Sequence, residues 1–217
     1  MRSTTNLLLA FTLALAACGG NSDNNNNNVV ADPPDMATLP PDLSPPPRGP
    51  YPDGPYGLVE GSVLFNLTAK GYHLKADATD ATSLQYEDVS IGELHANPAC
   101  KCIMLAQSAT WCGPCNAEQA TLVQAETDDP SLCVFNVLVD GPTPGKRPTP
   151  NDVLDWNGAH SQNFPIVGSN IQTYLHLPSP TALPTNVVID PVTMKIISIG
   201  AGFDPNAQLT AKNLCNL

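Results

Sequence analysis

Two cysteines with the spacing Cys-x-x-Cys, Cys112 and Cys115, are the side chains of this sequence best suited to covalent chemistry. Gly113 and Pro114 separate them and helix-forming residues follow, so Cys112 would stand at the amino end of a helix. Free backbone N–H groups and the helix dipole favour a thiolate there, and the thiolate is the form of cysteine that attacks a disulfide. The spacing therefore predicts Cys112 as a nucleophile and the more buried Cys115 as the thiol that resolves a mixed disulfide.

Two other uses of this pair are open. The pair could be a purely structural disulfide, or it could join Cys100 and Cys102 in a four-thiolate zinc site. The zinc site is disfavoured because residues 102–106 are expected to form a strand, whose rise of about 3.3 Å per residue would keep the two cysteine pairs apart. We therefore expect no metal, and the residues indicate no other cofactor.

The segments around the cysteine pair must position it. Residues 102–106 and 134–139 are short apolar runs, typical of strands that are buried on both faces of a sheet. Between them, residues 114 to about 127 begin with a proline suited to the first helical turn and continue with good helix formers. These segments predict a strand–helix–strand unit in which the cysteines begin the helix. A further helix is expected over residues 150–160.

Strands are also expected near both ends of the domain. Residues 186–189 and 195–199 are apolar runs on either side of a turn at residues 190–193, which predicts a hairpin at the edge of the sheet. Residues 62–67 and 89–94 could supply a leading hairpin or strand. Strands and helices therefore alternate, as in an α/β fold.

The order of these elements resembles a thioredoxin fold, because Leu183-Pro184-Thr185 directly precedes the terminal hairpin and Trp-Cys-Gly-Pro-Cys begins the first helix. More narrowly, residues 57 to about 205 resemble the extracytoplasmic redoxins of the TlpA/ResA and AhpC/TSA superfamily. Weaker matches to that superfamily lie at residues 61–67, 89–94 and 164–167. The resemblance implies an α/β, thioredoxin-like fold: a central mixed sheet flanked by helices, with an N-terminal β extension and a helical insertion.

The resemblance also implies roles for residues near the cysteines. Pro184 matches a cis-proline whose loop lies against the active-site disulfide and offers backbone groups to an extended substrate. Glu118 matches a glutamate that would shuttle a proton to and from Cys115, and the alternative is a solvated carboxylate favoured by the helix dipole. Thioredoxin's own buried aspartate is missing, since Ala106 lies six residues before Cys112. The expected substrate-binding residues are Trp111, Gly113, Pro114, Leu183 and Thr185.

The amino terminus is typical of an exported chain. Residues 1–17 carry one positive charge, Arg2, and then an apolar run shorter than the ~20 residues that span a bilayer. Leu15-Ala16-Ala17-Cys18 resembles the lipobox of bacterial lipoproteins, so we expect cleavage after the signal peptide and a lipid anchor on Cys18. An ordinary signal peptide is the alternative. By resemblance to the sorting of enterobacterial lipoproteins, Gly19 in place of an aspartate implies the outer membrane, facing the periplasm.

The rest of the chain divides into a tether and one domain. Residues 18–55 are rich in asparagine and proline and poor in large apolar residues, so they are expected to be a disordered tether. Residues 56–217 are enough for one redoxin domain with a hydrophobic core. A net charge of −11 without a basic cluster argues against a nucleic-acid partner. The scattered histidines are mostly expected at the surface, namely His73, His95, His160 and His176.

Four cysteines remain once Cys18 is lipidated and the Cys-x-x-Cys pair is bonded: Cys100, Cys102, Cys133 and Cys215. Outside the cytoplasm disulfides persist, so two structural disulfides are expected, with free buried thiols as the alternative. Cys102 and Cys133 stand where neighbouring strands would begin, and Cys215 lies in the segment that the resemblance makes the closing helix. The pairs Cys102–Cys133 and Cys100–Cys215 are therefore preferred over the crossed pairing.

The expected function is a membrane-tethered thiol-disulfide oxidoreductase that exchanges disulfides with protein cysteines outside the cytoplasm. Its expected partners are cysteine-bearing protein substrates and a membrane or periplasmic redox partner, and the domain is expected to be a monomer. The Gly-Pro dipeptide resembles that of reducing thioredoxins, but the direction depends on the partner that recharges the pair. The alternatives are a binding or copper-handling module without turnover, and a thiol peroxidase, whose Pro-x-x-x-Thr pattern before a cysteine is not evident.

Overall fold

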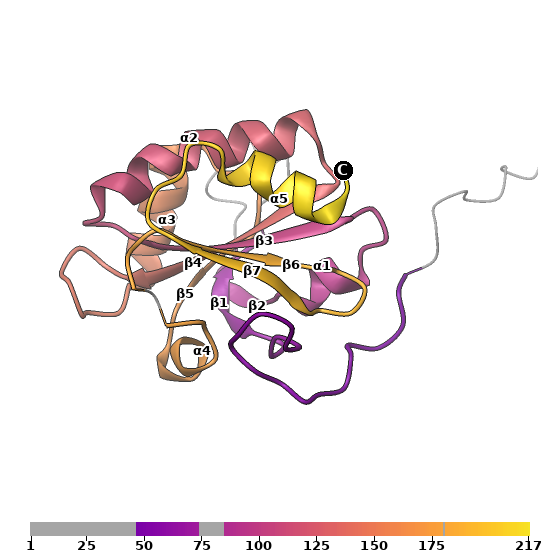
Figure 1. Ribbon diagram of the computed structural model, residues 1–217. Helices are drawn as coiled ribbons and strands as arrows, with labels where there is room; N and C mark the ends of the chain where they lie inside the picture. The colour runs from indigo at the N-terminus through magenta and orange to yellow at the C-terminus, as the bar shows by residue number, and fades with distance from the viewer. Residues whose placement is uncertain (1–46, 74–84, 180) are drawn as a thin grey trace, which may run out of the picture. The chain divides into compact units, whose positions relative to one another are not determined.

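The computed structural model describes residues 47–73, 85–179 and 181–217. In these residues seven strands form one mixed sheet in the order β2-β1-β5-β4-β3-β6-β7, with five helices around it (Figure 1). The strands are β1 (Thr68–Tyr72), β2 (Glu87–Ser90), β3 (Cys102–Ala109), β4 (Leu132–Asp140), β5 (Ile166–Gly168), β6 (Thr185–Ile189) and β7 (Ile196–Ala201). The helices are α1 (Gly92–Ala96), α2 (Gly113–Asp128), α3 (Pro150–His160), α4 (Ile171–Leu175) and α5 (Ala207–Cys215). The expected α/β fold with a central mixed sheet is confirmed.

The centre of the sheet is the parallel pair of β3 and β4, in which every residue of β3 is buried. β6 pairs with β3 in the antiparallel sense and continues into β7, so the predicted terminal hairpin is present. The strands predicted at residues 102–106 and 134–139 are confirmed, and both are longer than expected. The helices predicted at residues 114–127 and 150–160 correspond to α2 and α3. β3 therefore leads directly to the cysteine pair at the start of α2.

The two faces of the sheet carry separate apolar clusters. α2 and α5 lie over one face (Figure 1), where the buried cluster includes Met104 of β3, Leu122 of α2 and Ala211 of α5. The cluster on the other face is larger and includes Phe135 of β4 and Trp156 of α3. The sheet is thus covered on both sides, as the continuous apolar runs of β3 and β4 require.

The N-terminal β extension is present but lies elsewhere than predicted. Residues 62–67 form no regular strand, because their buried positions, Val63, Leu64 and Leu67, do not alternate and only Val63 forms isolated bridges. β1 follows immediately and pairs with β2 in an antiparallel hairpin. Residues 89–94 hold the end of β2 and the start of α1 rather than one strand.

The folded part begins before residue 56, so the expected boundary of the tether is wrong. The Arg48 guanidinium donates hydrogen bonds to the backbone oxygens of His95, Asn97 and Cys100. These carbonyl groups lie at the end of α1 and in the turn that follows it. Because the last carbonyl groups of a helix lack partners within it, the cation of Arg48 satisfies groups that would otherwise be unpaired.

Aromatic and imidazole side chains also attach residues 48–55 to the domain. The Tyr51 hydroxyl donates to Leu64 O at 2.9 Å, and its ring packs against the ring of His95 with centroids 5.5 Å apart. His95 is only 4% exposed, so the expectation of a surface histidine is wrong at this position. The signal segment, Cys18 and the tether up to residue 46 lie outside the described residues. Within the described residues, no helix is long and apolar enough to cross a membrane.

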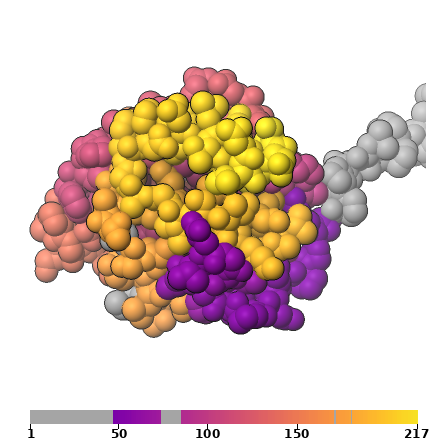
Figure 2. All heavy atoms as spheres, viewed as in Figure 1, coloured from indigo at the N-terminus to yellow at the C-terminus, as the bar shows by residue number. Residues whose placement is uncertain are grey.

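The N-terminal segment then runs over the β6–β7 hairpin. Gly61 N donates to Ile196 O and Leu64 N donates to Met194 O, both at 2.8 Å. Figure 2 shows the N-terminal residues (indigo) against the hairpin (orange) on one face of the molecule. This crossing covers part of the outer strand β7 with backbone hydrogen bonds.

The described cysteines form three disulfides, Cys100–Cys133, Cys102–Cys215 and Cys112–Cys115. The preferred pairing of Cys102 with Cys133 is therefore wrong, as is that of Cys100 with Cys215. In the β3–β4 register Cys102 lies opposite Leu132, and the next residue, Cys133, points to the other face of the sheet. Cys102 consequently lies in the cluster beneath α5, whereas Cys100 and Cys133 lie in the opposite cluster.

Candidate active site

The cysteine pair lies at the start of α2. Cys112 is the N-cap residue, its Sγ accepts the backbone N–H of Cys115 at 3.1 Å, and Pro114 stands in the first turn. The Cα atoms of the two cysteines are 5.2 Å apart. Cys112 is 4% exposed and Cys115 is fully buried. After reduction, the helix end and the donated N–H would both stabilise negative charge on the sulfur of Cys112.

The loop before β6 lies at the same edge of the sheet as the cysteines. Thr185 pairs with Gln107, two residues before the end of β3, and Leu183 packs against the core cluster that contains both cysteines. The peptide bond between Leu183 and Pro184 is cis, as the resemblance implied. Pro184 O accepts the N–H of Gly202 at 2.7 Å, which ties this loop to the residue after β7.

Glu118 is buried beneath the first turns of α2. Its side chain has no solvent exposure, so the alternative of a solvated carboxylate is wrong. Asn186 Nδ2 donates to Glu118 Oε1 at 2.6 Å, and Oε2 has no hydrogen-bond partner among the described residues. Burial raises the pKa of the Glu118 carboxyl from 4.5 to about 7; the Asn186 hydrogen bond lowers this pKa and the charge of Asp204 raises it. Glu118 follows Cys115 by three residues, which places the two side chains on one face of the helix, about 5–6 Å apart at Cβ.

A buried amide network next to Glu118 was not anticipated from the sequence. Gln119 Nε2 donates to Ser108 Oγ at 3.2 Å, and Gln119 Oε1 accepts from Asn136 Nδ2 at 2.9 Å and from Gln162 Nε2 at 2.5 Å. All four side chains are buried. The signal that could have revealed it is the presence of polar residues inside otherwise apolar strands. This network fixes α2 against β3 and β4, because Gln119 of α2 is bonded to a side chain of each strand.

The residue at the position of thioredoxin's missing aspartate also has amide side chains as its neighbours. Ala106 of β3 lies directly opposite Asn136 of β4 on one side and Asn186 of β6 on the other. Beneath α2 the sheet therefore carries the two amide side chains and the methyl group of Ala106. The carboxyl group near the cysteines belongs to Glu118 of the helix. An amide donor can hold either protonation state of a carboxyl, which suits a group that gains and loses a proton.

The rim of the site includes His160, one of the four histidines that were mostly expected at the surface. His160 Nε2 lies 3.1 Å from Asn116 Oδ1, and Asn116 Nδ2 donates to Cys112 O at 2.8 Å. Burial lowers the pKa of His160, so the neutral imidazole predominates at neutral pH. On another part of the rim, Trp111 is 45% exposed, and its Nε1 donates to Asp140 Oδ2 at 3.4 Å.

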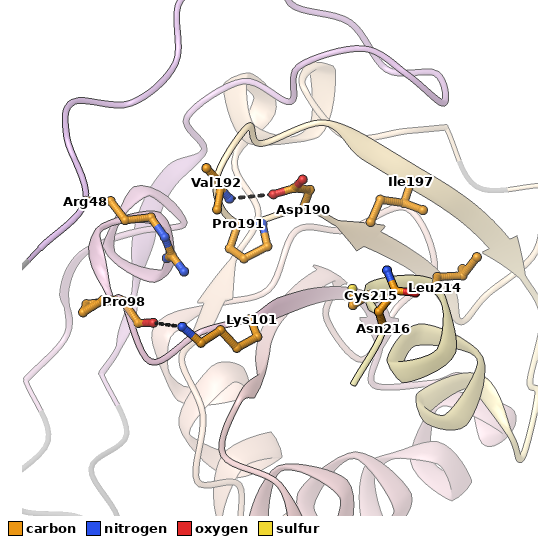
Figure 3. Close-up of a pocket in the computed structure, with 10 residues that line it drawn as sticks. All are labelled: Arg48, Pro98, Lys101, Asp190, Pro191, Val192, Ile197, Leu214, Cys215 and Asn216. Atoms are coloured by element: carbon orange, nitrogen blue, oxygen red, sulfur yellow. Dashed lines mark hydrogen bonds between the residues drawn. The ribbon is translucent and has the colours of Figure 1, made fainter. Parts of the chain in front are cut away.

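A cavity of about 420 Å³ lies at the other end of β3, away from the cysteine pair (Figure 3). Arg48, Lys101 and Cys215 are among its lining residues. Lys101 Nζ donates to Pro98 O at 2.9 Å, and Arg48 is held by the carbonyl groups described above. Both cations are thus bound to backbone groups of the chain, and the cavity is separate from the Cys112–Cys115 pair.

The comparisons with known proteins bear on the fold. No protein-family model matches the chain, and no curated protein matches it. Among solved structures, the thioredoxin domain of a thiol-disulfide oxidoreductase from Bacteroides vulgatus is 16% identical, with a TM-score of 0.51 over 73% of this chain and 99% of that one. A DsbF homologue from Corynebacterium diphtheriae is 15% identical, with a TM-score of 0.51 over 76% and 99% of the two chains. A secreted thiol-disulfide isomerase from Corynebacterium glutamicum is 14% identical, with a TM-score of 0.50 over 71% and 86%. The chain therefore has the thioredoxin-like fold.

Proposed function

We propose that this chain is an extracytoplasmic thiol-disulfide oxidoreductase that acts on protein cysteines. The observation that carries the proposal is the arrangement at the start of α2. Cys112 lies at the helix end, Cys115 is fully buried, and the buried carboxyl of Glu118 follows about one turn further along. A purely structural disulfide needs neither the buried carboxyl nor the adjacent cis-proline loop. Solved structures with this fold that are named as a thiol-disulfide oxidoreductase and as a secreted thiol-disulfide isomerase support the same interpretation.

The reaction proceeds in two exchanges. The thiolate of Cys112 attacks one sulfur of a substrate disulfide, that S–S bond breaks, and the other substrate sulfur leaves as a thiolate. The Cys115 thiol then gives its proton to the Glu118 carboxylate, and the new thiolate attacks Cys112 Sγ. The Cys112–Cys115 bond forms, and the second substrate thiolate leaves with the electron pair. Run in reverse, the same steps oxidise a substrate dithiol, with Glu118 returning the proton to Cys115.

Substrates would dock on the rim around the cysteine pair. Trp111 presents an exposed aromatic face, and Gly113 and Pro114 are exposed beside it. The loop of Leu183 and Thr185 offers backbone groups at the same edge of the sheet, which suits an extended polypeptide. An extended segment with a cysteine at its centre is therefore the expected substrate.

Reduction of insulin tests the catalytic proposal. The purified chain should accelerate the reduction of insulin disulfides by dithiothreitol, and Cys112→Ser should abolish the acceleration. Cys115→Ser should instead accumulate mixed disulfides, because the first exchange proceeds and the second does not. In the native host, the proteins trapped by Cys115→Ser would include substrates and the membrane or periplasmic redox partner. A wild-type chain with no effect on insulin would contradict catalytic turnover. A binding or copper-handling module would then be the remaining function.

The proposed location is the periplasmic side of a bacterial outer membrane, with a lipid on Cys18. Disulfides at Cys100–Cys133 and Cys102–Cys215 support a compartment in which disulfides persist. Replacing Cys18 by Ala should move the protein from the membrane fraction to the soluble fraction, since the anchor is then lost. Intact-mass measurement checks this directly: an unmodified Cys18 in the wild-type chain would contradict the proposal.

A further inference from the structure

The burial of Glu118 raises the question of how its proton reaches water. The side chain has no solvent exposure, because it lies on the buried face of α2. Each resolution of a mixed disulfide delivers one proton to this carboxyl, so the carboxyl must lose that proton before the next turnover. This requirement rests on the proposed function of the site, since an idle carboxyl needs no exchange with solvent.

A cavity of about 180 Å³ begins at the hydrogen-bond partner of Glu118. Asn186 lines it, is 6% exposed, and holds Glu118 Oε1 through its Nδ2 atom. The Oδ1 atom of Asn186 has no hydrogen-bond partner in the described part of the chain. The remaining walls come from Val188 of β6, from β7, from the loop after it and from α5, and their polar residues include Ser198, Thr210 and Asp204. The cavity thus joins a buried amide to an exposed carboxylate.

The chemistry of this cavity favours water. It is far larger than the ~10–15 Å³ that one water needs, and its polar atoms supply the two to four partners that hold a buried water. Two buried oxygens, Glu118 Oε2 and Asn186 Oδ1, have no partner among the described side chains. Each can accept a hydrogen bond from water when the carboxyl is ionised.

We propose that this cavity is the proton channel of the active site, in which Asn186 positions Glu118 and Asp204 exchanges the proton with bulk water. After the Cys115 thiol has protonated Glu118, the carboxylic acid gives that proton to the water chain. The chain passes a proton to the Asp204 carboxylate, which releases it to solvent, and Glu118 is again a carboxylate. No electron moves in this step, and one proton leaves for each Cys112–Cys115 bond formed.

Among the described residues, Asp204 is the charged group that shifts the pKa of Glu118. On its own helix the nearest titratable groups are Cys112 and Cys115, whereas Glu126 and Asp128 lie about two turns or more further along. Asn186 approaches it from β6, and Asp204 acts on it from the loop after β7. The negative charge of Asp204 raises the pKa of Glu118. Asp204 therefore has two effects that can be measured separately: it shifts the pH dependence of the base, and it serves as the outlet of the channel.

Gly200 offers a way to block the channel. It lies directly opposite Asn186 in the β6–β7 pair, and a Cβ atom there would approach only Asn186 O, at 3.9 Å. Gly200→Val would therefore place a β-branched side chain, which strands favour, on the lining of the cavity without a clash at its Cβ. Gly158→Val is the matched control, because a Cβ at Gly158 of α3 meets no atom within 4 Å and so introduces no clash either.

The decisive experiment follows single turnovers of the full chain, solubilised in non-ionic detergent, with a disulfide-bonded peptide from pH 5 to 9. Rapid quenching separates formation of the mixed disulfide from its resolution. Gly200→Val should leave the rate of mixed-disulfide formation unchanged and slow its resolution about tenfold. This is a part of the 10²–10⁴-fold rate acceleration that a positioned acid–base group contributes. The slowed step should show a larger solvent deuterium isotope effect than the wild type. Gly158→Val should behave as wild type.

A second variant tests the channel without filling it. Asp204→Asn should shift the midpoint of the resolution profile to lower pH, because the charge that raises the pKa of Glu118 is gone. It should also slow resolution several-fold, and added formate should restore the rate by replacing the lost carboxylate. Asp53→Asn, which removes an exposed carboxylate from the N-terminal loop, is the control and should change neither property.

The outcomes separate the channel from the proposed function. Resolution at wild-type rates in both Gly200→Val and Asp204→Asn would overturn the channel while disulfide exchange stands. A wild-type chain that forms no mixed disulfide would overturn the proposed function and the channel with it. Thermal unfolding is measured for each variant, and if Gly200→Val unfolds, then Asp204→Asn with formate rescue decides alone.

Discussion

Cys112 and Cys115 differ in their surroundings although three residues separate them. Cys112 caps α2 and accepts a backbone N–H, whereas Cys115 is enclosed by the core. The sequence already indicated this difference, because a proline two residues after Cys112 marks the start of a helix. The burial of Glu118 was less predictable, since its partner Asn186 lies 68 residues further along the chain. Only the fold brings that strand beneath the helix.

The two thiols should react at different rates in the reduced chain. The helix end and the N–H of Cys115 stabilise the thiolate of Cys112, so its pKa should lie below the ~8.5 of a free thiol. We expect iodoacetamide at pH 7 to alkylate Cys112 at least about tenfold faster than Cys115, as peptide mass mapping over time would show. Equal rates at the two positions would contradict the assignment of the nucleophile.

Glu118 should make the stability of the domain depend on pH. Its folded-state pKa is about 7 against 4.5 for the free side chain, so between these values the folded state binds more protons than the unfolded state. Stability therefore falls as the pH rises from 4.5 to 7, by about 3 kcal/mol at most for this group. Glu118→Gln should remove this loss, as urea unfolding at pH 5 and pH 8 would show.

Glu126 supplies the control for that measurement. Burial raises its pKa to about 7 as well, but it lies further along α2, where Val134 N contacts it at 3.4 Å. Glu126→Gln should reduce the pH dependence of stability and leave the rate of disulfide exchange unchanged. Glu118→Gln should change both. If Glu118→Gln left the pH profile of exchange unaltered, its proposed role as the base would be wrong.

At the scale of elements, the apolar runs predicted β3, β4, β6 and β7, and helix signals predicted α2 and α3. β1 was missed because its sequence, TAKGY, has few apolar residues, a lysine at its centre and a glycine beside it. The disulfide pairing was missed because it depends on strand register: a shift of one residue between β3 and β4 turns Cys133 to the face opposite Cys102. Neither composition nor spacing reports that register.

The disulfide between Cys102 and Cys215 should contribute more to stability than the one between Cys100 and Cys133. The first joins residues 113 apart and the second residues 33 apart, and loop-closure entropy grows with that separation. Replacing both cysteines of the long-range bond by alanine should lower the free energy of unfolding by about 1 kcal/mol more than the same change in the other bond. Urea unfolding of the two double variants measures the difference. A reversed order would show that packing around the cysteines outweighs chain entropy.

For the molecule as a whole, the attachment of the N-terminal segment lies far from the Cys112–Cys115 pair. Arg48 binds the carbonyl groups of Asn97 and Cys100, just before β3, whereas Cys112 follows the other end of that strand. Eight residues of strand span about 26 Å. A chain tethered through Cys18 would therefore join the domain at the end opposite the cysteine pair. Proline-rich composition suggested a tether as far as residue 55, and it concealed this attachment because Arg48 lies among prolines.

Removing the Arg48 side chain should loosen this attachment. The guanidinium donates to three backbone oxygens, and hydrogen bonds from a charged group contribute about 1.5–3 kcal/mol each at most, less where water can replace them. Arg48→Ala should lower the free energy of unfolding by about 2 kcal/mol and open residues 48–55 to limited proteolysis. Lys70→Ala is the control, because its ion pair with Asp88 is exposed and such pairs contribute little. Resistance of Arg48→Ala to proteolysis equal to that of Lys70→Ala would contradict the role of Arg48 in attaching residues 48–55 to the domain.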